Sequence, residues 1–218
     1  MEFENFFLQR GINLKNPKQM QTAFTHTSYA NEHHVESYER LEFLGDAVLE
    51  VITSEYFYLN TDLKEGDMTK IRASYVCEHA LATYAKEIGL NKYIRVGHGQ
   101  QENVNDTIIA DVFESVLGAL YLDAGYEAAK TYAYQIIVPY IEKKAVFLTD
   151  YKSALQEMVQ TDKESLTYDL VKEEGPAHDK TFTVNVVIDG IIYGTGVGKS
   201  KKEAEQKAAY DAYQKRAK

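Results

Sequence analysis

Three acidic residues share one face of a predicted helix near the start of the chain. Glu39, Glu42 and Asp46 stand in the segment ERLEFLGD (39–46) with the spacing i, i+3 and i+7, which places their side chains on the same side of a helix. The residues between them are mostly apolar, so partial burial of this face is expected. Because unpaired carboxylates are costly to bury, the pattern predicts either basic partners or a bound cation.

A second acidic pair has the same character. Asp111 and Glu114 are spaced i, i+3 within the otherwise apolar run IIADVFE (108–114). Two helices that each offer carboxylates from apolar surroundings can converge on one divalent cation. With oxygen ligands only, and a single cysteine in the chain, Mg²⁺ or Mn²⁺ is favoured over Zn²⁺. The alternative, that these acids form solvated helix faces with ordinary ion pairs, stays open on the pattern alone.

The elements that position these acids are predicted to be helices. Apolar residues recur with the 3.6-residue period of a helix in successive runs, namely 38–59, 67–88, 105–122 and 126–145. Gly89 and Gly125 stand near the ends of such runs, as C-terminal stop signals do.

From residue 150 the pattern changes. Asp150 is a suitable N-cap for a short helix, and strand-like runs follow at Leu166–Lys172, Thr181–Ile188 and Ile191–Val197, before a last helix at 201–214. Asp189 and Gly190 predict a tight hairpin between the last two strands. The predicted fold class is therefore an all-α domain over residues 1–145 and an α+β domain of order α-β-β-β-α over 150–218, with 144–149 as the linker.

Charge is distributed unevenly along the chain. The formal net charge is −9, of which residues 1–149 carry −8, with 13 Lys and Arg against 21 Asp and Glu, whereas residues 150–218 carry −1. An acidic first part disfavours a nucleic-acid partner there unless a cation reverses its charge locally. No apolar run is long enough to cross a bilayer, and the acidic N-terminus lacks a signal-peptide pattern. A cytoplasmic protein without a membrane partner is therefore expected.

The segment GTGVGKS (194–200) lies between a predicted strand and the last helix. It is a near match to a phosphate-binding loop, but Tyr193 stands where the motif requires glycine, so no nucleotide cofactor is expected. Ser200 and Glu203 have the spacing of a capping box and mark the start of the helix.

Polar groups suited to RNA occur at three places in this second part. They are Ser153, Gln156 and Glu157 on the polar face of the short helix, His178 in the loop 175–180, and Lys199, Lys201 and Lys202 at the start of the last helix. Lysines at a helix N-terminus, where free N–H groups already favour anions, predict a phosphate contact. Such an arrangement is typical of double-stranded RNA recognition through 2′-hydroxyls and phosphates. The alternatives are a plain loop residue at His178 and a merely solvated basic helix start.

The segment at 39–46 resembles the signature of the ribonuclease III family. THTSY (25–29), EGDMTKIRA (65–73) and IADVFE (109–114) are similar to its other sequence blocks, in the same order. The C-terminal part, with GP (175–176) and KSKKEA (199–204), resembles a double-stranded-RNA-binding domain. The resemblance covers nearly the whole chain and is to bacterial members, in which one ribonuclease III catalytic domain precedes one RNA-binding domain.

This resemblance implies roles for particular residues. It places the metal ligands at Glu42, Asp46, Asp111 and Glu114, two assisting catalytic acids at Glu39 and Glu65, the dimer contact at Phe43, and the RNA contacts at Ser153, Gln156, Glu157, His178, Lys199, Lys201 and Lys202. Tyr38 stands where many members have Asn, a change not expected to affect catalysis. His26 is assigned a structural hydrogen bond rather than the role of a general base.

The activity implied by the resemblance is cleavage of double-stranded RNA by metal-activated water. The expected cofactor is Mg²⁺, with Mn²⁺ able to substitute. Each subunit of a homodimer is expected to cut one strand, leaving 5′-phosphate and 3′-hydroxyl ends with short 3′ overhangs, in ribosomal RNA precursors and some mRNAs. Two other interpretations remain, a duplex-RNA regulator that does not cut and a metal-dependent phosphohydrolase that acts on nucleotides.

Overall fold

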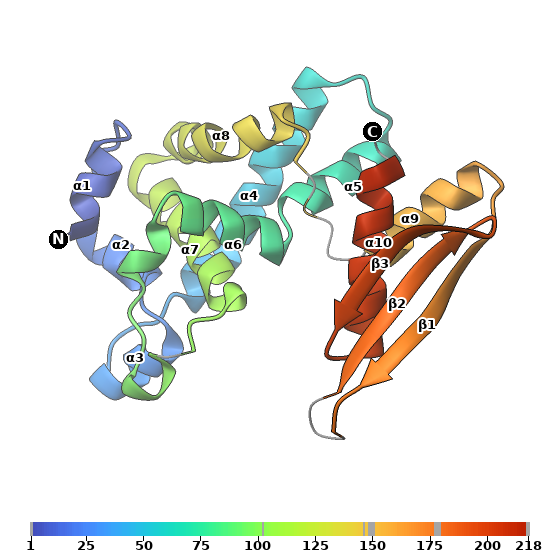
Figure 1. Ribbon diagram of the computed structural model, residues 1–218. Helices are drawn as coiled ribbons and strands as arrows, with labels where there is room; N and C mark the ends of the chain where they lie inside the picture. The colour runs from blue at the N-terminus through green and yellow to red at the C-terminus, as the bar shows by residue number, and fades with distance from the viewer. Residues whose placement is uncertain (1, 102, 146, 148–150, 177–179, 217–218) are drawn as a thin grey trace. The chain divides into compact units, whose positions relative to one another are not determined.

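A computed structural model describes residues 2–101, 103–145, 147, 151–176 and 180–216 of the chain, without the side chains of Glu2 and Glu157 (Figure 1). The chain forms two compact units, Met1–Phe147 and Leu148–Lys218. Several residues of the predicted linker 144–149 lie outside the described ones, as does the predicted N-cap Asp150, so both stay predictions.

The first unit is built from helices. They are α1 (Glu2–Leu8), α2 (Pro17–Ala23), α3 (Thr27–His33), α4 (Glu39–Asn60), α5 (Glu65–Tyr75), α6 (Glu78–Glu87), the short 3₁₀ turns η1 (Leu90–Tyr93) and η2 (His98–Gln100), α7 (Asp106–Ala124) and α8 (Tyr126–Glu142). Among the described residues, no helix has both the length and the apolar character needed to span a membrane.

Helix α7 is the centre of this unit (Figure 1), in contact with α2, α4, α6 and α8. Its side chains from Ile108 to Leu120 are almost all buried, because a helix that is apolar on every side must be surrounded by others. The Asn105 side chain accepts a hydrogen bond from the Ile108 N–H and caps its start, and Gly125, at φ 84°, follows its last turn. The predicted stop at Gly125 is confirmed.

The prediction of one helix over 67–88 was wrong. The structure has two, α5 and α6, separated by Val76 and Cys77. Cys77 adopts an extended conformation, φ −70° and ψ 155°, and serves as the N-cap of α6. No glycine or proline marks this break in the sequence.

The second unit has the predicted order α-β-β-β-α. Its elements are α9 (Tyr151–Thr161), β1 (Leu166–Glu174), β2 (Thr181–Ile188), β3 (Ile191–Gly198) and α10 (Lys201–Arg216). The strands form an antiparallel sheet of order β1-β2-β3, and α9 and α10 lie on one face of it (Figure 1). Asp189 and Gly190 both have positive φ, 48° and 79°, which is the tight hairpin that the sequence predicted.

The glycines of the segment 194–200 have a packing role. Gly194 and Gly196 lie in β3, facing α10, and a Cβ on either would overlap the backbone of that helix at Ala208. Their spacing therefore reflects close contact between a strand and a helix.

Candidate functional site

Helices α4 and α7 cross in backbone contact. A Cβ added to Gly45 of α4 would overlap the carbonyl oxygen of Glu114 in α7, and one added to Gly118 would lie 3.0 Å from the Gly45 nitrogen. Glycine at both positions is therefore what permits this approach. Since Glu42 and Asp46 flank Gly45 on α4, the crossing brings them next to Glu114.

The predicted acids of the two helices act on one another electrostatically. Burial, together with the negative charges of Asp46, Glu42 and Asp111, raises the pKa of Glu114 to about 8. Burial also raises the pKa of Glu42, with Asp111 as the next contributor. The structure thus brings together the four carboxylates that the sequence assigned to a cation site.

The donor set fits a hard divalent cation by its chemistry. The four side chains offer oxygen atoms only, and their mutual repulsion is the kind that a cation relieves. Within the described part of the chain, no three His, Cys, Asp or Glu side chains are arranged as a group that could hold a metal ion. The fit therefore rests on the oxygen donors and their mutual repulsion.

Tyr38 contacts this cluster, which the sequence did not predict. Its side chain is 4% exposed, and its hydroxyl donates a hydrogen bond to Asp111 Oδ2 at 2.8 Å. Burial and that bond raise the pKa of the hydroxyl, so it stays protonated and donates. Burial raises the pKa of Asp111, while the bond from Tyr38 opposes the rise. The sequence offered one signal for this contact, because a tyrosine that is buried needs a polar partner for its hydroxyl.

The two acids predicted to assist the site, Glu39 and Glu65, have different surroundings. Glu39 is exposed, accepts a hydrogen bond from Ser37 Oγ at 2.9 Å, and its charge raises the pKa of Glu42. Glu65 begins α5, where Thr69 Oγ1 donates to it at 3.4 Å. Glu39 thus acts on one of the four carboxylates, whereas the contact made by Glu65 is within α5.

His26 has a structural hydrogen bond. Its Nδ1 accepts from the Ser28 N–H at 3.2 Å and caps the start of α3. Burial lowers the pKa of its imidazole. These contacts agree with the structural role expected of it.

Phe43 projects from α4 into solvent, with 82% of its surface exposed. It lines a groove of about 940 Å³ whose wall also includes Leu44 and Leu122. Leu122, on α7, is itself 53% exposed. An exposed aromatic side chain beside a partly apolar groove is typical of a protein interface.

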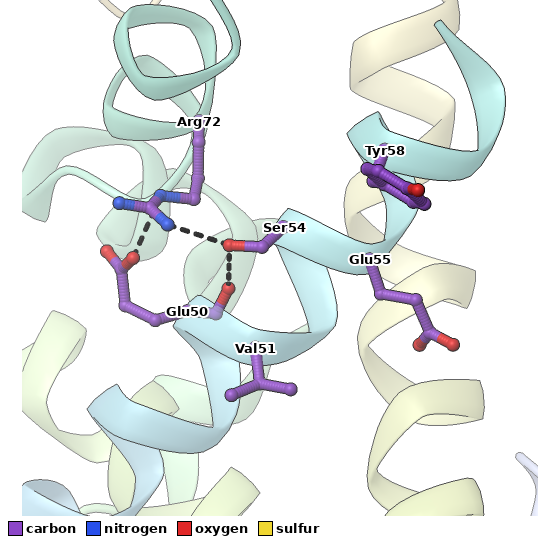
Figure 2. A pocket seen from close by; sticks show the side chains of 6 residues that line it. All are labelled: Glu50, Val51, Ser54, Glu55, Tyr58 and Arg72. Carbon is purple, nitrogen blue, oxygen red and sulfur yellow. Dashed lines mark hydrogen bonds and ion pairs between the residues drawn. The ribbon is translucent and has the colours of Figure 1, made fainter. Parts of the chain in front are cut away.

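Arg72 connects α5 to α4 through an ion pair and a hydrogen bond. Figure 2 shows its guanidinium reaching across, with Nε paired to Glu50 Oε2 at 2.8 Å and Nη1 donating to Ser54 Oγ at 2.7 Å. These residues line a shallow pocket of about 490 Å³, along with the exposed Val51 and Tyr58. The pairing holds the helix that carries Glu65 and offsets the charge of Glu50, which also acts on Glu114.

Two of the predicted RNA contacts of the second unit lie on α9. Ser153 and Gln156 are exposed on α9, whose apolar side packs against the sheet through Leu155 and Val159. His178 and the side chain of Glu157 lie outside the described residues.

The start of α10 is basic and capped. Ser200 Oγ accepts from the Glu203 N–H at 3.1 Å, and the Glu203 carboxylate accepts from the Lys199 N–H at 2.7 Å. Lys199, Lys201 and Lys202 are exposed there, and the Lys201 ammonium also lies 5.9 Å from the ring centre of Phe182.

Both units match known protein families. A family model described as "Ribonuclease-III-like" matches residues 16–141, and one described as "Double-stranded RNA binding motif" matches residues 151–216. The chain is 45% identical over 214 residues to the Ribonuclease 3 of Listeria monocytogenes serovar 1/2a, covering 94% of this chain and 93% of that protein. It is 46% identical over 205 residues to the Ribonuclease 3 of Streptococcus pneumoniae, covering 90% and 88%.

Solved structures agree for the first unit. The nuclease domain of ribonuclease III from Campylobacter jejuni superposes with a TM-score of 0.58 at 33% identity, covering 64% of this chain and 96% of that domain. A second structure of that domain, with the same TM-score, is described as flexible in a region involved in dimer formation. The chain therefore belongs to the ribonuclease III family of double-stranded-RNA endoribonucleases, with a helical catalytic domain followed by a double-stranded-RNA-binding domain.

Proposed function

We propose that this enzyme is a homodimer that cuts both strands of an RNA duplex with the help of Mg²⁺, leaving 5′-phosphate and 3′-hydroxyl ends with short 3′ overhangs. The observation that carries the proposal is the crossing at Gly45, which sets Glu42 and Asp46 beside Glu114. Burial of Glu114, together with the charges of Asp46 and Glu42, raises its pKa to about 8, so this position favours a bound proton or a bound cation.

Glu42, Asp46, Asp111 and Glu114 would hold the ion, with Mn²⁺ as an alternative to Mg²⁺. When bound, the ion supplies positive charge for the scissile phosphate and acidifies a water molecule for attack on phosphorus. Glu114 must first lose the proton that its raised pKa favours, because only the carboxylate binds a cation. Glu39, exposed beside Glu42, and Glu65, on α5, are proposed to assist.

Phe43 is the proposed anchor of the dimer. In a two-fold dimer the same surface serves both subunits, so each Phe43 enters the groove beside Leu44 and Leu122 of the other subunit. The exposure of Phe43 and the partly apolar wall of the groove support this assignment. Dimer formation in the Campylobacter jejuni nuclease domain accords with it.

The second unit is proposed to hold the duplex through its backbone. Lys199, Lys201 and Lys202 would contact phosphates, which supply most of the affinity for nucleic acid. Ser153 and Gln156, with Glu157 and His178, would contact 2′-hydroxyls in the minor grooves. The net charge is −1 in residues 150–218 and −8 in residues 1–149. This difference supports RNA binding by the second unit and metal-dependent catalysis by the first.

The proposed substrates are duplex stems in ribosomal RNA precursors and in some mRNAs, in the cytoplasm. The experiment that tests the proposal is digestion of a ribosomal precursor stem with Mg²⁺, followed by sequencing of both product ends. Staggered cuts on the two strands, with 5′ ends that are substrates for a 5′-phosphate-dependent exonuclease, are expected. Blunt products, or 5′-hydroxyl ends, would overturn the proposed geometry or chemistry.

A further inference from the structure

A tyrosine hydroxyl connects the start of α4 to one of the proposed metal ligands. Tyr38 donates to Asp111 Oδ2 at 2.8 Å, across 73 residues of sequence. We propose that Tyr38 is a positioning residue that holds the Asp111 carboxylate in place for the divalent cation. The inference rests on the metal site of the proposed function and deepens it.

The Tyr38 backbone is fixed on both sides. Its N–H donates to the Thr25 carbonyl at 2.8 Å, and its own carbonyl accepts from the N–H groups of Leu41 and Glu42 at 2.8 and 2.9 Å. Tyr38 is thus the N-cap residue of α4, the helix that carries Glu42 and Asp46. A displacement of the α4 N-terminus would therefore also move the hydrogen-bond donor of Asp111.

The Tyr38 side chain is held as firmly as its backbone. It is 4% exposed, and its ring lies 5.8 Å from that of His26. A rigid ring on a fixed backbone gives the hydroxyl one position. The hydroxyl can therefore determine the orientation of the Asp111 carboxylate.

A neutral donor suits this position. A lysine or arginine paired with Asp111 would supply positive charge and reduce the attraction of the site for a cation. A tyrosine hydroxyl orients one carboxylate oxygen and leaves the charge of Asp111 available. Hydrogen bonds that orient metal-ligating groups typically change metal affinity by about 10- to 100-fold when removed.

The test is the variant Tyr38→Phe, which keeps the ring and removes the hydroxyl. Two readouts are needed: the Mg²⁺ concentration at half-maximal thermal stabilisation of the protein without RNA, and the Mg²⁺ concentration at half-maximal cleavage. We expect both to rise by about tenfold, while the rate at saturating Mg²⁺ changes less than about twofold. A change in the two midpoints without a change in the rate at saturating Mg²⁺ separates the orientation of a metal ligand from a general loss of activity.

Tyr84→Phe is the matched control. Tyr84 is fully buried, and its hydroxyl donates to the Tyr75 carbonyl at 3.2 Å, so the control also removes one hydrogen bond from a buried tyrosine in the same unit. We expect its Mg²⁺ midpoints to equal those of the unchanged enzyme.

A double variant tests whether the effect of Tyr38 on Mg²⁺ binding acts through Asp111. In an Asp111→Asn background, Tyr38→Phe should move the Mg²⁺ midpoint of thermal stabilisation less than about twofold, because the two effects share one interaction. An undiminished tenfold effect there, or unchanged midpoints for Tyr38→Phe alone, would overturn the inference. If the unchanged enzyme itself were not stabilised by Mg²⁺ and did not cleave, the proposed metal site would fail, and the inference with it.

Discussion

Gly45 and Gly118 face one another where α4 crosses α7, so closely that a methyl group on Gly118 would lie 3.0 Å from the Gly45 nitrogen. The carboxylates lie on either side of this contact, Glu42 and Asp46 on one helix and Glu114 on the other. A Cβ at either position would overlap the backbone of the facing helix, at Glu114 for Gly45 and at Leu41 for Gly118. The distance between the acidic groups is thus set by two residues that have no side chain.

Gly45→Ala is expected to destabilise the protein by about 1–3 kcal/mol or more, because the new methyl group overlaps the Glu114 carbonyl. Urea denaturation measures this. Gly66→Ala is the control, since a Cβ at Gly66 in α5 meets nothing within 4 Å, and it should be neutral or stabilise by up to about 1 kcal/mol. Equal effects of the two substitutions would contradict the close crossing.

The contribution of Glu114 to the stability of the metal-free protein is expected to fall as pH rises from 4.5 to about 8. The folded state raises the pKa of Glu114 from 4.5 to about 8, so in this range it keeps a proton that the unfolded chain has released. Protons bound only by the folded state stabilise it, and that contribution disappears as pH passes the folded pKa.

Thermal melts in EDTA across this pH range, for the unchanged protein and Glu114→Gln, measure the effect. Gln does not titrate, so the unchanged protein should lose stability relative to the variant as pH rises. A constant difference between the two melting temperatures from pH 4.5 to 8 would show that Glu114 has an ordinary pKa.

Phe43→Ala is expected to weaken the dimer at least tenfold. Removing a central aromatic anchor typically costs about 2 kcal/mol or more, and tenfold corresponds to about 1.4 kcal/mol. Sedimentation over a range of protein concentrations measures the constant. Leu8→Ala, which truncates another exposed apolar side chain (62%) on α1, is the control. A dimer constant unaffected by Phe43→Ala would remove that residue from the interface.

Replacing Lys201 and Lys202 together by Ala is expected to weaken duplex binding and to lower its salt dependence. Each lost phosphate contact reduces the slope of log K against log salt by up to about one. Lys172 and Lys215, exposed and paired with Glu174 and Asp211, provide a control pair with the same change in net charge. The same slope for both double variants would show that the lysines of α10 do not touch phosphate.

The sequence predicted those elements whose cause is local. The apolar periods of α4 and α7, the hairpin at Asp189 and Gly190, and the capping residue Ser200 all depend on neighbours within a few positions. They appear in the structure close to where the sequence places them.

Features set by distant residues were missed. The break before α6 falls at Cys77, whose thiol contacts the carbonyls of Ser74 and, 70 residues later, Phe147, each at 3.3 Å. The bond from Tyr38 to Asp111 spans 73 residues, and Arg72 reaches Ser54 across 18. Periodicity and spacing describe one helix at a time, so they assign acids to a helix face but not the groups that meet them from another helix.

The proposed metal-dependent cleavage is tested most directly by digestion of a long RNA duplex with the unchanged enzyme and with Glu114→Gln, in Mg²⁺ and in EDTA, with duplex binding measured in parallel. We expect short duplex products with 3′ overhangs from the unchanged enzyme in Mg²⁺ only, and binding without cleavage from Glu114→Gln. Glu127→Gln, an exposed change on α8, should cleave normally. Binding of the duplex without cleavage by the unchanged enzyme in Mg²⁺ would contradict the proposed activity and favour a regulator that binds RNA without cutting it.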